Sequence, residues 1–165
     1  MEPYHVSISA EAFAAAQFAR AGCDVSVQYG ANQPEYDLLI KRGNQFKMIS
    51  VKGSQKGGWG LVQSYKKGRT YHQAIDAWAA DQNQLIVYCL VGFNELEFNQ
   101  MPRMYLASII DLTNELKAQR RGEGTTSLTE NYTYTNGKLK GWTDRIPDAW
   151  LFTEERVNSF LHRAA

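Results

Sequence analysis

The sequence of 165 residues suits a single domain, and 44% hydrophobic with 21% charged residues is the composition of a soluble globular protein. These values exclude a disordered, collagen-like or coiled-coil chain. The net charge is +1, so the protein is not basic as a whole, and binding to nucleic acid would require a local concentration of positive charge.

The first predicted element is a helix over residues 9–22, where small and apolar residues recur at helical spacing. Ser7 or Ser9 can cap its first turn. Glu11 lies on or beside the apolar stripe, where a carboxylate is costly unless something pairs with it. The alternative is that Glu11 is a first-turn acid that favours the helix dipole. A strand over 23–28 is expected to follow.

Two strand-like runs, 36–42 and 45–52, follow a predicted loop over 30–34 and flank Gly43-Asn44. These two residues are typical of a tight hairpin turn. Both faces of the hairpin are largely apolar, so it is expected in a sheet that is covered on two sides.

A two-residue turn at this point also fixes the pairing of the two strands. Leu39 is then opposite Met48, and Asp37 is opposite Ser50. Asp37, Ser50 and Lys52 are therefore predicted to share one face at the open end of the hairpin. The alternative is a structural ion pair, which is the more common role of an aspartate and a lysine at strand ends.

The rest of the chain alternates between helical and strand-like segments. They are a polar glycine-rich loop (53–69), a helix (70–82), a buried strand (84–93), a strand (104–109), a helix (110–121), a loose hairpin around Asn136-Gly137, a turn at 148–150 and a helix capped by Thr153. This order predicts one α/β domain over residues 1–165, with three layers and a mixed β-sheet flanked by helices. Residues 9–93 would form its core, and 94–165 an extension packed on that core.

The sequence contains no segment typical of a membrane or secreted protein. The longest apolar run, 85–93, is shorter than the about 20 residues that a membrane helix needs. The first residues lack the pattern of a signal peptide, so we expect a cytoplasmic protein. Cys23 and Cys89 lie in apolar stretches without a CxxC pattern, which predicts buried free thiols rather than zinc ligands.

The acidic and basic residues of the N-terminal half follow a recognisable order. A helix with Glu11 precedes the run Glu35-Tyr36-Asp37, and the next strand carries Ile49-Ser50-Val51-Lys52. This pattern, together with the following helix and central strand, resembles the PD-(D/E)xK nuclease superfamily. It is most similar to the Holliday-junction-resolvase and homing-endonuclease-like members.

The resemblance implies a restriction-endonuclease-like fold and a metal-dependent DNA endonuclease that hydrolyses phosphodiester bonds. It implies that Asp37 binds the metal, that Lys52 lies near the attacking water and that Glu11 is the helical acid. The metal would be Mg²⁺, with Mn²⁺ as a substitute, because hard cations prefer carboxylate oxygens. A homodimer is also expected, since cleavage of a duplex needs two active sites.

Ser50 departs from the family pattern, because the second acid is expected two residues before the lysine. A serine hydroxyl at this position does not supply the negative charge that an acid would offer to a metal. Glu11 is the best substitute for the missing acid, and Glu35 is a weaker one. The departure leaves open a second reading, in which the chain is a catalytically degenerate nuclease fold that binds nucleic acid or protein.

The glycine-rich loop concentrates the positive charge that DNA binding needs. Its basic residues are Lys56, Lys66, Lys67 and Arg69, which can follow a phosphate backbone or simply form a solvated loop. Trp59 can stack on a base or pack over the domain edge. His72, three residues after Arg69, is a candidate phosphate contact.

Overall fold

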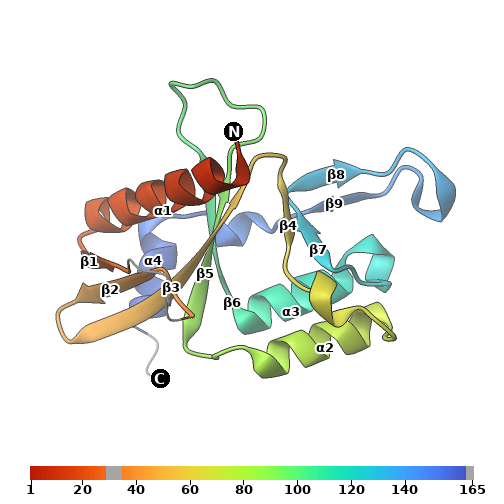
Figure 1. Cartoon of the computed structure of the whole chain (residues 1–165), viewed down its shortest axis with the longest axis horizontal. Coiled ribbons are helices and arrows are strands. Elements are labelled where there is room, and N and C mark those ends of the chain that lie inside the picture. Colours follow the sequence, from red (N-terminus) through yellow and green to blue (C-terminus); the bar gives the residue numbers. More distant parts are fainter. Residues whose placement is uncertain (29–34, 163–165) are drawn as a thin grey trace.

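The computed structural model, which describes residues 1–28 and 35–162, has a five-stranded mixed sheet between two layers of helices (Figure 1). The strands of the sheet, in spatial order, are β1 (Asp24–Val27), β2 (Leu38–Arg42), β3 (Gln45–Ser54), β5 (Ile86–Gly92) and β6 (Arg103–Ser108). The helices are α1 (Pro3–Arg20), α2 (Tyr71–Asp81), α3 (Ile109–Ala118) and α4 (Glu154–Leu161). The predicted α/β class is confirmed.

The β2–β3 hairpin has the predicted register over its regular part. Arg42 pairs with Gln45 and Leu39 with Met48. The chain turns at Gly43, whose φ of 59° lies in the region that glycine adopts without strain. Strand β5 then pairs with β3 in parallel, and the connection between them runs through α2.

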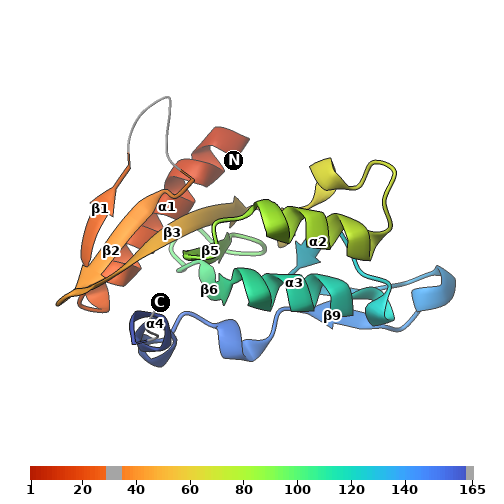
Figure 2. The same ribbon diagram turned by 90° about the horizontal axis from the view of Figure 1, so that it is seen from below.

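The two faces of the sheet carry separate hydrophobic cores. Leu38, Ile49 and Val51 face α1 and α4, whereas Tyr88 and Leu90 face α2 and α3. In Figure 2, α2 and α3 lie together on one side of the strands. Helix α1 packs across β3, and this packing places the first turns of α1 beside the last residues of that strand.

Helix α1 begins earlier than the sequence predicts. Pro3 occupies its first turn, where the missing N–H costs nothing and the fixed φ favours a helix. Ser7 and Ser9 therefore lie inside the helix, and their predicted capping role is wrong. Gly22, with a φ of 79°, ends the helix as predicted.

Threonine caps two further helices, and the cap at Thr153 is the predicted one. Thr70 forms a capping box with Gln73 at the start of α2, and Thr153 accepts a hydrogen bond from the Arg156 N–H at the start of α4. The 3-10 turn over Asp148–Trp150 also lies where it is predicted.

The loop over 53–69 contains a strand that the sequence does not reveal. Its β4 (Gly58–Gly60) pairs with β7 (Ser127–Thr129). A second ribbon joins β8 (Asn131–Thr133) to β9 (Thr143–Arg145), which is the predicted loose hairpin. Residues 94–162 also supply β6 to the sheet and α4 to the core, so they are continuous with the region over 9–93. The predicted loop over 30–34 lies outside the described residues.

Cys23 and Cys89 are both buried and free, as predicted. Within the described part of the chain, no helix combines the length and the apolar character needed to cross a membrane.

Candidate active site

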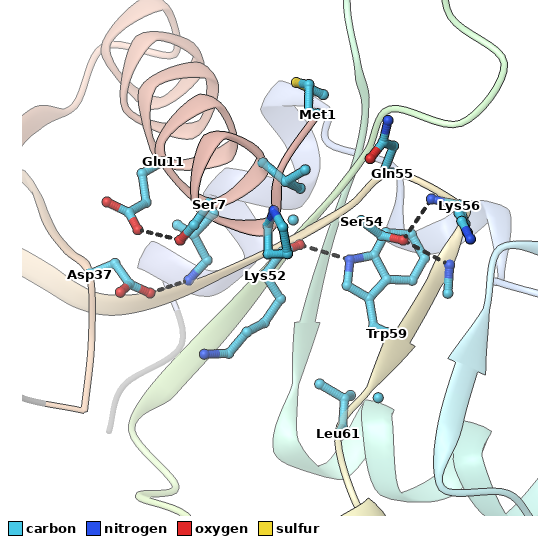
Figure 3. Close-up of a pocket in the computed structure, with 16 residues that line it drawn as sticks. Met1, Ser7, Glu11, Asp37, Lys52, Ser54, Gln55, Lys56, Trp59 and Leu61 are labelled. Atoms are coloured by element: carbon cyan, nitrogen blue, oxygen red, sulfur yellow. Dashed lines mark hydrogen bonds between the residues drawn. The ribbon is translucent and has the colours of Figure 1, made fainter.

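A cleft of about 590 Å³ opens between the first turns of α1, the end of β3 and strand β4. Glu11, Asp37 and Lys52 all line it, and they come from three different elements of the fold (Figure 3). Glu11 reaches the cleft from α1, whereas the Lys52 side chain extends from β3 away from that helix. Asp37 lies where β2 and β3 begin to separate. The structure thus brings three of the four predicted catalytic residues to one cavity.

Asp37 is held by the backbone of the neighbouring strand. Its N–H donates to the carbonyl of Ile49 at 2.8 Å, although Ile49 is already the ladder partner of Leu38. The Asp37 carboxylate accepts a hydrogen bond of 2.6 Å from the Val51 N–H. These two contacts hold the carboxylate against the backbone of Val51, on the wall of the cleft.

Asp37 and Lys52 do not form the structural ion pair that the sequence left as an alternative. Among the described residues, no salt bridge within 4.0 Å joins Lys52 to Asp37 or Glu11. The Glu11 carboxylate accepts a hydrogen bond of 3.1 Å from the Ser7 hydroxyl, one helical turn away. Lys52 is exposed, and no acid of the described residues neutralises its charge.

The turn after Lys52 is fixed by Ser54, which sequence reasoning missed, and by Trp59, for which it predicted other roles. The Ser54 hydroxyl is buried and accepts hydrogen bonds from the N–H groups of Lys56 and Gly58. The Trp59 indole N–H donates to the Lys52 carbonyl at 2.8 Å. Because these contacts hold the backbone on both sides of the turn, they position Lys52. A serine and a tryptophan at this spacing carry no sequence signal for such a role.

Ser50 does not belong to this cleft. It is 3% exposed, and in the sheet it lies opposite Tyr88 of β5. The predicted pairing of Asp37 with Ser50 is absent from the ladder, because β2 leaves the regular register at Leu38 and the Asp37 carboxylate turns to the Val51 N–H. The prediction that Ser50 faces the metal site is therefore wrong.

Glu35 is exposed and does not line the cleft, so Glu11 is the better candidate for a second carboxylate. The negative charges of Glu35 and Asp37 nevertheless act on Tyr88 of β5. Burial raises the pKa of Tyr88 to about 12, and the charges of Glu35 and Asp37 add to this rise.

The oxygen atoms of two carboxylates suit Mg²⁺ or Mn²⁺. Two carboxylates do not fill the coordination shell of either ion. Mg²⁺ commonly takes one or two protein carboxylates and completes its shell with water and phosphate oxygens. Over residues 1–28 and 35–162, no group of three or more His, Cys, Asp or Glu side chains is placed to hold a metal. A cation at Glu11 and Asp37 would therefore depend on substrate phosphate for part of its shell.

The basic loop, defined here as Lys66, Lys67 and Arg69, lies between the short turn over Gln63–Tyr65 and α2. The Lys66 ammonium donates to the Arg69 carbonyl, and the Arg69 guanidinium donates to the Tyr65 carbonyl. These acceptors are neutral, so the loop keeps its positive charge.

The other predicted nucleic-acid contacts differ in their accessibility. Lys56 is exposed on the rim of the cleft. His72 is exposed, but its Nε2 lies 2.9 Å from the Gly122 carbonyl, which ties it to a neighbouring turn. Trp59 is 3% exposed and packs edge-on against Tyr105. Its ring is not accessible to a base, so the alternative of a packed tryptophan is the correct one.

Gly53 allows α1 to approach β3 next to Lys52. A Cβ atom at this position would lie 2.9 Å from side-chain atoms of Val6 and Ala10. We expect Gly53→Ala to lower the free energy of unfolding by about 1–3 kcal/mol, because such overpacking forces the helix and strand apart. Gly58→Ala is the matched control, since its nearest atom would be 3.9 Å away. Equal urea midpoints for the two variants would contradict this close approach.

Comparisons of this chain with family models, with curated proteins and with solved structures find no match. The functional argument therefore depends on the geometry of the cleft and on the charges around it.

Proposed function

We propose that this protein is a metal-dependent endonuclease that hydrolyses phosphodiester bonds in DNA. The observation that carries the proposal is that Glu11, Asp37 and Lys52 line one cleft without a salt bridge between the lysine and either acid. Charged side chains at the surface that are not paired add little to the stability of the fold. Because Lys52 is not paired with either acid, we infer that the three side chains bind a ligand in the cleft.

The chemistry of phosphodiester hydrolysis matches these groups. A divalent cation, when bound, offsets charge on the phosphate and acidifies a water. The Asp37 and Glu11 carboxylates provide hard oxygen ligands for such a cation. The Lys52 ammonium stabilises the negative charge that develops on the phosphate, or orients the attacking water. Trp59 supports this role of Lys52 by holding its backbone carbonyl.

The order of elements also agrees with the proposal. A helix with an acid, three antiparallel strands, a further helix and a parallel central strand is the pattern on which the resemblance to PD-(D/E)xK nucleases depends. We extend the proposal to a homodimer, because cutting both strands of a duplex requires a second cleft.

A second candidate function is a catalytically degenerate module that binds nucleic acid. The observation that favours it is the small number of acids: Ser50 replaces the second acid of the motif, and it is buried outside the cleft. With two carboxylates, metal affinity is weaker than with three.

Nicking of supercoiled plasmid distinguishes the two candidates. The endonuclease proposal predicts that the full chain converts plasmid to open-circular and linear forms with Mg²⁺ or Mn²⁺, and that a chelator stops the reaction. Retarded migration of intact plasmid, with no nicking in either metal, would instead support the binding module.

The basic loop is expected to contribute to DNA affinity without sequence preference. Replacing Lys66, Lys67 and Arg69 together by alanine should flatten the dependence of log affinity on log salt by up to about 3, since each phosphate contact contributes roughly 0.9. Fluorescence anisotropy with unrelated duplexes over a salt series measures this slope. An unchanged slope would show that the basic loop does not contact the phosphates.

A further inference from the structure

A two-stranded arm, residues 131–145, projects from the end of the molecule opposite the β1–β2 edge (Figure 1). It consists of β8, β9 and the turn between them. Lys138 and Lys140 are exposed on the arm, as are the aromatic rings of Tyr132 and Trp142. The proposed cleavage reaction gives this segment no role.

A buried carboxylate fixes the base of the arm. Asp144 is 4% exposed and accepts hydrogen bonds from the Arg120 backbone N–H, the Tyr134 hydroxyl and the Trp142 indole N–H, with shortest distances of 2.9, 3.0 and 2.8 Å. These donors lie directly after β8, directly before β9 and in the turn that follows α3. The arm is therefore anchored to Arg120 and is not an isolated hairpin.

The turn at this anchor holds two arginines in an unfavourable backbone conformation. Arg120 and Arg121 both have a φ of 57°, a region that costs a residue with a side chain about 1–3 kcal/mol. Gly122 and Gly124, in the same turn, adopt positive φ without this cost. Glycine at positions 120 and 121 would adopt the same backbone conformation without this cost. The arginine side chains are therefore expected to have a use of their own.

The guanidinium groups are positioned by aromatic rings, which do not neutralise them. Arg121 lies over the ring of Trp142 at 5.1 Å, and Arg120 lies over Tyr71 at 5.2 Å. An aromatic face attracts a cation but leaves its charge available to an anion. The Arg120 guanidinium also pairs with Glu123 at 3.3 Å, whereas no salt bridge of the described residues includes Arg121.

The ring of Tyr71 brings a cation at the base of the arm close to the basic loop. Arg120 and Lys138 line a shared hollow of about 300 Å³ at the base of the arm. The ring of Tyr71, on which Arg120 lies, also holds the Lys66 ammonium at 4.7 Å. In a chain with a net charge of +1, this concentration of charge favours a polyanionic partner.

We propose that Arg120, Arg121, Lys138, Lys140 and Trp142, here called the arm surface, bind the sugar-phosphate backbone of duplex DNA outside the cleft. The proposal rests on the proposed function only in the choice of DNA as the polyanion. Spaced cations held beside aromatic rings fit phosphate contacts, which set the position of a protein on a duplex without reading its sequence. The arm surface would thus extend the contact with DNA beyond the basic loop.

The test uses the full chain with Asp37→Asn in the presence of a chelator, so that binding is measured without cleavage. The arm variant adds Arg121→Ala, Lys138→Ala and Lys140→Ala. A charge-matched control adds Arg20→Ala, Lys41→Ala and Lys47→Ala, which lie on α1, β2 and β3. Anisotropy of a labelled duplex is recorded over a salt series, with circular dichroism to establish that each variant folds.

We expect the arm variant to bind about 10- to 100-fold more weakly at low salt and its salt slope to fall by up to about 3. The matched control should keep both values close to those of the parent chain. Equal losses in the two variants would overturn the proposal, since the effect would then follow net charge alone. Competition by poly-glutamate as effective as that by unlabelled duplex would also overturn it. Because no cleavage is measured, a chain without nuclease activity can still pass this test.

Discussion

Asp37→Asn is expected to reduce metal-dependent cleavage by about 10³-fold or more, because cation stabilisation of the transition state is worth several kcal/mol. Asparagine keeps an oxygen that can accept the Val51 N–H, so the strand end should remain in place. The variant loses the negative charge that attracts the cation. Single-turnover cleavage with saturating Mg²⁺ and Mn²⁺ measures the loss.

Lys52→Met separates the role of the lysine from that of the acids. Loss of a donor at the developing charge costs roughly 10²–10³-fold in rate, while metal binding by Asp37 and Glu11 should persist. Asp24→Asn and Lys47→Met, on β1 and β3 outside the cleft, are the matched controls. Cleavage by the Asp37 or Lys52 variant at the rate of these controls would remove that residue from the reaction.

Glu130→Ala should lower the free energy of unfolding much more than the truncation of an exposed acid. Glu130 is 9% exposed and accepts hydrogen bonds from Arg103 at 2.6 and 2.7 Å and from Tyr105 at 2.8 Å. Its backbone N–H also donates to the carbonyl of Gly57, in the turn between β3 and β4. Truncation leaves the guanidinium without its partner. Because Arg103 is 36% exposed and can regain water, we expect about 2–3 kcal/mol, below the full penalty of a buried pair.

Asp148→Ala is the control for this loss. Asp148 also pairs with an arginine, Arg145, but their side chains are 78% and 63% exposed, and removing such a pair should change stability by less than about 1 kcal/mol. Urea unfolding compares the two variants. Equal midpoints would show that the Glu130 pair does not hold this part of the fold.

The Glu130 pair also predicts a dependence of stability on pH. Burial raises the pKa of this carboxyl, but hydrogen bonds from Arg103 and Tyr105 outweigh burial and leave the pKa below its usual value. A lowered pKa in the folded state means that the contribution is complete above the unfolded pKa of about 4.3 and is lost as pH falls through the folded pKa. The stability difference between the wild type and Glu130→Gln should therefore shrink below about pH 4. A constant difference from neutral to acid pH would contradict a charged Glu130.

Local patterns in the sequence were sufficient to predict much of the fold. Gly43-Asn44 fixed the β2–β3 register, Thr70 and Thr153 marked helix starts, and the apolar run in β5 indicated a central strand. Each of these signals lies within a few residues of the structure that it predicts. Their physical basis is turn chemistry, capping and burial, which do not depend on distant parts of the chain.

The remaining features depend on long-range contacts. The position of Ser50 could not be predicted because β2 leaves its ladder only where Asp37 reaches the backbone of Val51. Trp59 is buried because β4 pairs with β7, some 70 residues later in the chain. The contact of Arg121 with Trp142 could not be predicted either, because only the fold places the guanidinium over that ring. None of these pairings has a periodic signal in the sequence.

Calorimetric titration with Mn²⁺ tests most directly the claim that Glu11 and Asp37 form a cation site beside Lys52. The measurement compares the wild type with Asp37→Asn, Glu11→Gln and the exposed control Asp24→Asn. We predict saturable binding to the wild type and to Asp24→Asn, with loss of that binding in Asp37→Asn and weakening in Glu11→Gln. Equal Mn²⁺ affinity in the wild type and in Asp37→Asn, or no saturable binding to the wild type in the presence of duplex DNA, would contradict it.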